Sequence, residues 1–166
     1  MISATIQRLA AKGWKIVGDG VADSQKASRV AKLLGCVNDE LFTEWIGCRQ
    51  SIQNNNDTIW FLLSQSYLGE DGSAFPWDFI RRLELEAAEG YDDLQAETRD
   101  YWATRIPVLL DVSDGCYKAI VASVENGKLV RFQWISAPEF RGEGFVANDF
   151  EDFLSRVPQI LSSSVL

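Results

Sequence analysis

Residues 106–135 read IPVLLDVSDGCYKAIVASVENGKLVRFQWI, and this stretch predicts three short β-strands joined by tight turns. The first apolar run ends at Ser113-Asp-Gly115. The second ends at Asn126-Gly127, a dipeptide that suits the positive backbone dihedral angles of a two-residue hairpin turn. The stretch therefore predicts a β-meander and locates the sheet of the protein.

Helical and strand patterns flank the meander on both sides. Apolar residues recur at helical spacing, with caps at Asn38 or Asp39 and at Asn148-Asp149. The predicted helices are 1–12, 24–34, 38–48, 77–88 and 148–157, where Pro158 limits the last one. Residues 92–104 are either a further short helix or an ordered connection, and 64–68 are an irregular segment or a single helical turn. Residues 58–63 predict the first strand, and 53–57 and 137–147 predict loops.

This order of elements is typical of an α+β domain with an antiparallel sheet. The chain has 166 residues, 46% of them hydrophobic, which is enough to bury one full core. No internal repeat or long linker divides it. We therefore predict a single domain over residues 1–166, with the 106–135 meander packed against helices.

Charge and hydropathy limit the classes of function. The formal net charge is -8 and the sequence pI is about 4.6. This charge argues against a protein that binds a nucleic-acid backbone and favours basic partners, although selection for solubility alone explains it equally well. The start lacks the pattern of a secretory signal, and no stretch approaches the roughly 20 apolar residues that span a bilayer. We expect a soluble, cytoplasmic protein.

Most familiar catalytic designs are excluded because the chain contains no histidine. Its three cysteines include no Cys-x-x-Cys pair, which favours buried free thiols, Cys116 in the sheet among them. Asp111 and Asp114 flank the first turn of the meander and are candidates for a catalytic carboxylate pair. Their Asp-x-Ser-Asp-Gly setting is also ordinary turn composition, and this interpretation is favoured. We predict that the protein is not an enzyme and that it has no cofactor and no metal site.

The strongest charge feature is an acidic segment in the two predicted helices that precede the meander. Its members are Glu84, Glu86, Glu89, Asp92, Asp93, Glu97 and Asp100. Such a run is either a solvated helix face or a surface that binds a basic protein. Trp77 and Trp102 flank the segment and are candidate partner-binding anchors, with core placement as the alternative. Trp45, Trp60 and Trp134 lie in apolar segments and are predicted to be core residues.

The order of these features resembles the SUKH superfamily, whose fold is also found in a family of fungal regulators of cell-wall synthesis. The matching pieces are Leu34-Gly35, Asn38-Asp-Glu-Leu-Phe-Thr-Glu-Trp45, Ile59-Trp-Phe-Leu62, Ile106-Pro107, Asp114-Gly115-Cys-Tyr-Lys-Ala-Ile120, Gly127-Lys-Leu-Val130 and Asp149-Phe-Glu-Asp-Phe-Leu154. Together they cover most of residues 32–154. Cys36-Val37 stands where the family usually has Leu-Pro, and Gly47-Cys-Arg-Gln50 where it has Asn-Gly.

The resemblance implies an α+β domain without catalytic residues. Bacterial members commonly act as immunity proteins, which bind a cognate polymorphic toxin, often a nuclease, and block it inside the producing cell. The prediction is therefore an immunity protein with a toxin or another basic protein as its partner. The alternative is a regulatory or scaffolding SUKH-like module that binds a protein other than a toxin.

Overall fold

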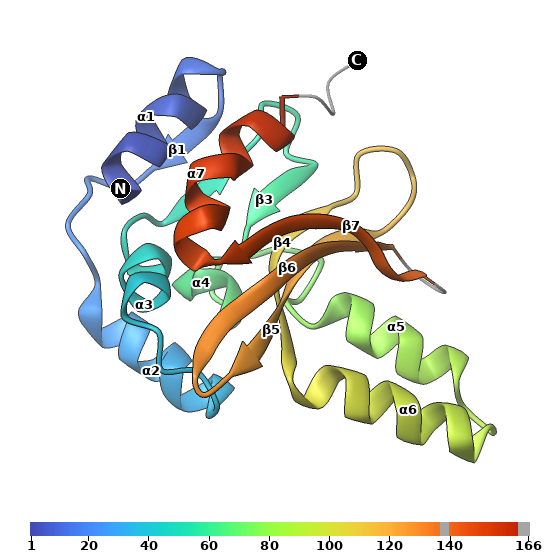
Figure 1. Cartoon of the computed structure of the whole chain (residues 1–166). Coiled ribbons are helices and arrows are strands. Elements are labelled where there is room, and N and C mark those ends of the chain that lie inside the picture. The colour runs from blue at the N-terminus through green and yellow to red at the C-terminus, as the bar shows by residue number, and fades with distance from the viewer. Residues whose placement is uncertain (137–139, 163–166) are drawn as a thin grey trace.

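The computed structural model describes residues 1–136 and 140–162, with the backbone alone for residues 140–143. An antiparallel sheet lies at its centre, and each strand of this sheet pairs with the next along the chain. The strands are β1 (Lys15–Val17), β2 (Ser51–Gln53), β3 (Ile59–Phe61), β4 (Arg105–Asp111), β5 (Lys118–Glu125), β6 (Lys128–Ser136) and β7 (Phe140–Asp149). The α+β fold class is confirmed, and the predicted meander corresponds to β4–β6 (Figure 1).

The turn between β5 and β6 has the conformation that its sequence predicts. Asn126 and Gly127 both have positive φ angles, 49° and 79°. Gly127 also lies against the start of a helix, because its carbonyl oxygen accepts a hydrogen bond of 2.7 Å from the Asn38 amide. A Cβ atom at position 127 would lie 3.1 Å from the Cβ of Asn38. Glycine is therefore required here both by the backbone angle and by the close approach.

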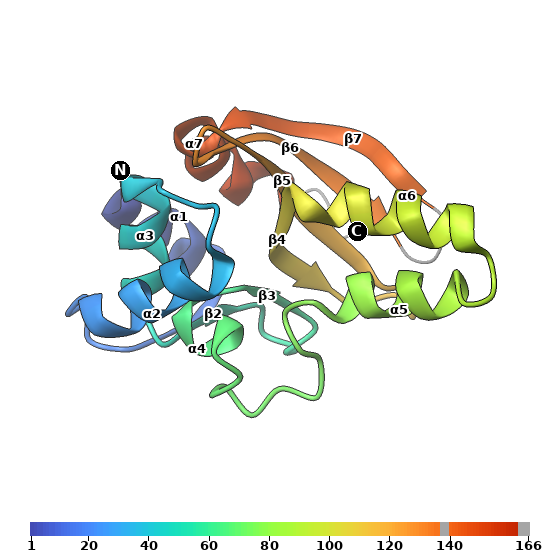
Figure 2. The same ribbon diagram turned by 90° about the horizontal axis from the view of Figure 1, so that it is seen from below.

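Helices surround the sheet unevenly. They are α1 (Ile2–Ala11), α2 (Ser24–Leu34), α3 (Glu40–Gly47), α4 (Ser64–Tyr67), α5 (Phe79–Ala87), α6 (Asp92–Ala103) and α7 (Phe150–Ile160). Helices α1, α2, α3 and α7 gather at one side of the molecule, whereas α5 and α6 project as a pair from the other side (Figures 1 and 2). The two segments with open alternatives, 64–68 and 92–104, both contain helices.

Aromatic side chains join α3 and α7 to the sheet. Phe153 stacks on Phe132 with ring centroids 4.7 Å apart, and Trp45 meets Phe61 edge-on at 5.2 Å. All four are almost fully buried. Such contacts contribute both apolar burial and favourable ring geometry. Trp45 is thus a core residue as predicted, while Trp60 and Trp134 are partly buried against the core.

Two predictions about the strands are wrong. Residues 58–63 do contain a strand, but it is not the first one, because β1 and β2 precede it. Those two strands have three residues each, too few to show an alternating pattern. Residues 140–147 form most of β7 rather than a loop, and 137–139 lie outside the described residues. Gly142 and Gly144 favour a loop in the sequence, yet shifts in the β6–β7 register accommodate this segment within the sheet.

Pro158 and two of the cysteines also differ from expectation. Pro158 lies inside α7, which continues to Ile160. Cys48 is buried as predicted, but Cys36 and Cys116 are exposed. Cys116 lies in the connection between β4 and β5 rather than in the sheet, which explains its exposure.

Candidate functional site

Helices α5 and α6 form a hairpin (Figure 2), and a buried polar contact between side chains holds their inner faces together. Ile80 and Glu84 on α5 and its C-cap residue Ala88 follow one another at four-residue spacing, and all three are buried. The Glu84 carboxylate accepts a hydrogen bond of 2.7 Å from the indole Nε1–H of Trp102 on α6. Because this bond involves a charged acceptor in a buried setting, it ties the two helices firmly together.

The acidic segment therefore divides into an inner and an outer part. Glu84 and Trp102 are only 5% and 6% exposed, so their side chains face each other rather than solvent. The exposed acidic residues are Glu86, Glu89, Asp92, Asp93, Glu97 and Asp100. They are spread along both helices and the turn between them, and we name these six residues the acidic hairpin surface. The exposed basic residues of the same region are Arg81, Arg82 and Arg99.

Two apolar side chains at the tip of the hairpin were not among the sequence candidates. Tyr91 is 67% exposed and Leu94 is 44% exposed. Both lie between acidic residues where α6 begins. Exposed aromatic and aliphatic side chains ringed by charges are a common composition of protein-binding surfaces. The signal in the sequence is the position of Tyr91 directly after Gly90, at the turn between two amphipathic helices.

Trp77 lies at the base of the hairpin. Its ring packs against Tyr67 at a centroid distance of 5.6 Å, and it is partly buried. Tyr67 is itself anchored to the sheet, because its hydroxyl donates to the Pro107 carbonyl oxygen at 2.6 Å. Burial raises the pKa of Tyr67, so this hydroxyl keeps its proton and the bond. Trp77 thus joins the hairpin to the body of the protein and lies away from the tip.

The aspartates of the first meander turn serve the turn itself. Asp111 is buried and accepts hydrogen bonds from the backbone amide and the hydroxyl of Ser113. Asp114 is exposed and pairs with Lys118, and this hydrogen bond holds the pKa of Asp114 below its usual value. The two carboxylates are engaged with different partners, and both accept hydrogen bonds from backbone amides of the turn, which supports the turn interpretation.

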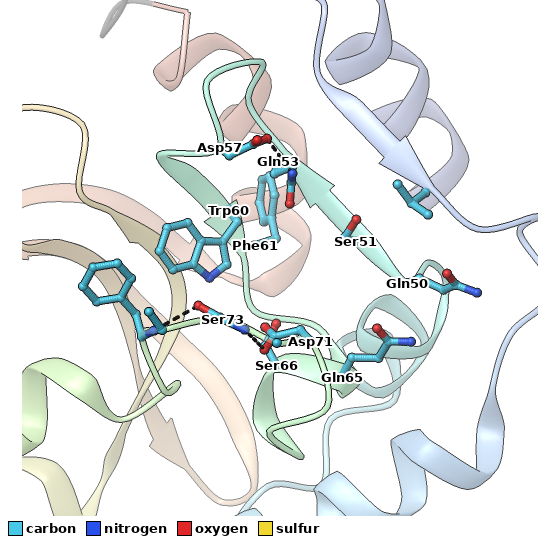
Figure 3. Close-up of a pocket in the computed structure, with 14 residues that line it drawn as sticks. Gln50, Ser51, Gln53, Asp57, Trp60, Phe61, Gln65, Ser66, Asp71 and Ser73 are labelled. Carbon is cyan, nitrogen blue, oxygen red and sulfur yellow. Dashed lines mark hydrogen bonds between the residues drawn. The ribbon is translucent and has the colours of Figure 1, made fainter.

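A separate pocket of about 390 Å³ lies on the β1–β3 part of the sheet (Figure 3). Strands β2 and β3 supply Gln53 and Trp60, which pair in the sheet register. The opposite wall is α4 together with the loop at 71–75. Asp57 at the rim accepts hydrogen bonds from Lys15 and Gln53, and the bond from Lys15 is the main cause that lowers the pKa of Asp57. None of these residues is a candidate from the sequence patterns.

Comparison of the chain with protein-family models, curated proteins and solved structures found no match. The resemblance to SUKH proteins therefore stays a prediction. Within residues 1–136 and 140–162, no group of three or more potential ligand side chains is placed to hold a metal ion. In the same part of the chain, no helix has both the length and the apolar character needed to cross a bilayer.

Proposed function

We propose that this chain is an immunity protein, which binds a cognate toxin domain through the acidic hairpin surface and neutralises it. The observation that carries the proposal is the projecting hairpin (Figure 1), which presents six exposed acidic side chains around Tyr91 and Leu94. The resemblance to SUKH proteins supplies the class of partner, a polymorphic toxin such as a nuclease.

Charge supports a basic partner. Clustered carboxylates attract a positively charged surface over a distance comparable to the Debye length, about 8 Å at physiological ionic strength. Nuclease domains carry such surfaces because their substrates are polyanions. The acidic hairpin surface competes for the same surface and accelerates association, while Tyr91 and Leu94 supply apolar contacts that slow dissociation.

The proposal is tested by co-expression of this chain with the product of the gene next to its own. We expect co-purification of the two products and survival of cells that express the toxin. Absence of both binding and protection contradicts the proposal. Stable binding to a partner without toxicity supports the alternative, a regulatory or scaffolding module.

A matched pair of charge reversals tests the surface. Glu89→Lys with Glu97→Lys reverses two charges on the hairpin, and Asp19→Lys with Glu44→Lys reverses two exposed charges outside it. Only the hairpin pair is expected to slow association and to reduce its dependence on salt. Equal association rates for the two double variants place the interface elsewhere.

A further inference from the structure

The pocket on strands β1–β3 is built on a part of the sheet where polar side chains share one face. Val17 pairs with Ser51, and Gln53 pairs with Trp60, so the sheet register brings these residues to one side. Ile52, between Ser51 and Gln53, points the other way into the core. Val17, Ser51, Gln53 and Trp60 all line the pocket, whose volume of about 390 Å³ lies within the range of small-molecule sites.

The opposite wall is held at both ends. Glu70 forms ion pairs with Lys26 at 3.1 Å and with Arg29 at 3.2 Å, which tie the start of the loop to α2. At the other end, Phe75 packs against Phe79 with ring centroids 5.0 Å apart and against Trp60 at 5.9 Å. The pocket is therefore formed before any ligand arrives, which lowers the entropic cost of binding.

Several polar groups of the lining are available to a ligand. Among the described residues, the side-chain amides of Gln50 and Gln65 and the hydroxyl of Ser51 have no hydrogen-bond partner. Figure 3 shows Gln50 and Gln65 at the end of the pocket away from Trp60. Each amide offers both a donor and an acceptor, and a serine hydroxyl does the same.

Trp60 adds a specific requirement. Its indole Nε1–H is shielded from solvent and has no hydrogen-bond partner within the described part of the chain. In Figure 3 this nitrogen points toward the loop that carries Asp71 and Ser73. Buried donors are almost always paired in folded proteins, so an unpaired one beside a pocket is a donor that the acceptor of a ligand can satisfy.

These groups together select one class of ligand. The carboxylates of Asp57 and Asp71 in the pocket lining disfavour an anionic ligand. A cationic ligand is disfavoured because a guanidinium or ammonium group has no acceptor for the Trp60 N–H. Hydroxyl groups both donate and accept, and the C–H bonds of a sugar ring pack on the face of an indole. We propose that this pocket binds a neutral saccharide, with Trp60 as the aromatic platform and Gln50, Gln53 and Gln65 as hydrogen-bonding partners. The site is distinct from the acidic hairpin surface and does not depend on its function.

The test is a two-dimensional NMR titration of the intact ¹⁵N-labelled chain with three probes, maltose, cellobiose and N,N′-diacetylchitobiose. Each probe is added to about 10 mM, which would nearly saturate a site with a Kd of about 1 mM. We expect at least one probe to shift the Trp60 indole resonance together with amides of β2 and of residues 71–75. N-acetylarginine amide serves as a cationic probe. No shift with any saccharide, or shifts at these resonances with the arginine derivative alone, overturns the proposal.

Matched variants locate the binding. Trp60→Phe retains a ring but removes the N–H, and Gln65→Ala removes one amide, whereas Trp134→Phe and Gln95→Ala make the same changes outside the pocket. We expect the Kd to rise by about tenfold in the pocket variants and to stay unchanged in the other two. Thermal unfolding without ligand checks that each variant is folded. An unchanged Kd in folded Trp60→Phe and Gln65→Ala also overturns the proposal.

Discussion

The hydroxyl of Thr5 in α1 donates a buried hydrogen bond of 2.9 Å to the carbonyl oxygen of Leu154 in α7. In a regular helix this oxygen would accept from the amide of residue 158, but that residue is Pro158 and has no N–H. A side chain from the other end of the sequence thus replaces the missing helical donor. The contact explains how α7 continues past a proline and why α1 docks against it.

Replacing Thr5 by valine should lower the free energy of unfolding by about 1–3 kcal/mol, because the buried Leu154 carbonyl then has no strong donor. In a Pro158→Ala background the same change should cost less, since the substituted residue supplies the helical N–H that proline lacks. Urea denaturation of the four proteins of this double-mutant cycle measures the difference. Ser3→Ala, an exposed change in the same helix, is the control. Equal costs of Thr5→Val in both backgrounds would show that the two residues are not coupled.

Strong local signals predict much of the fold. The Asn126-Gly127 turn and the caps at Asp39 and Asp149 depend on neighbouring residues, so the sequence alone reveals them. Strands β1 and β2 depend instead on pairing with distant residues, and their three-residue length carries no periodic pattern. Pro158 wrongly predicts the end of the last helix for the same reason. The missing N–H of the proline is replaced by the distant Thr5 hydroxyl, which no local pattern indicates.

Asp39 should be the more important of the two helix caps. One of its carboxylate oxygens accepts from the Phe42 amide in α3, and the other accepts from the Leu129 amide in β6 at 3.1 Å. Asp149 accepts from the Asp152 amide and is exposed. We expect Asp39→Ala to cost about 2–4 kcal/mol and Asp149→Ala about 1 kcal/mol, measured by urea denaturation. Similar costs for the two would mean that the bond to Leu129 contributes little.

The three cysteines should differ in reactivity. Cys48 is buried, and its desolvation raises the pKa of the thiol to about 11, whereas Cys36 and Cys116 are exposed. At pH 8, Ellman's reagent should therefore titrate two thiols rapidly in the folded protein and three in denaturant. Cys48→Ala should leave the number of rapid thiols unchanged. Rapid reaction of all three in the folded protein would contradict the burial of Cys48.

The same thiol gives a pH dependence with a definite sign. The ordinary pKa of a cysteine thiol is 9.0 and the folded pKa of Cys48 is about 11, so the unfolded chain loses this proton first as the pH rises. Stability should accordingly fall between about pH 9 and 11, in addition to contributions from other groups. Burial of Tyr67 raises its pKa and acts in the same direction. The free energy of unfolding of Cys48→Ala, subtracted from that of the wild type at each pH, isolates the contribution of the thiol. A difference that does not vary between pH 9 and 11 would contradict the raised pKa of Cys48.

The candidate surface shows what charge patterns in a sequence can and cannot predict. Helical spacing places Glu84 in line with Ile80 and Ala88, and so on the inner face of the hairpin. The charge pattern alone does not distinguish buried Glu84 from exposed Glu86, because both are glutamates in the same acidic segment. The partner of Glu84 is Trp102, on the other helix of the hairpin, and only packing reveals that bond. The exposed Tyr91 and Leu94 carry no charge and so fall outside an electrostatic search.

Glu84 and Glu86 provide the sharpest comparison within the acidic segment. Glu84→Lys places a cation where a buried carboxylate accepts from the Trp102 indole, so it should destabilise the protein by about 3 kcal/mol or more. Glu86→Lys changes the charge by the same amount at an exposed position and should shift stability by about 0.5 kcal/mol or less. Thermal unfolding measures the first effect. Association kinetics with the proposed toxin partner at low and high salt measure the second, and Glu86→Lys should slow association at low salt alone. A stable Glu84→Lys protein, or a Glu86→Lys protein that binds as fast as the wild type, would contradict the division into inner and outer acidic residues.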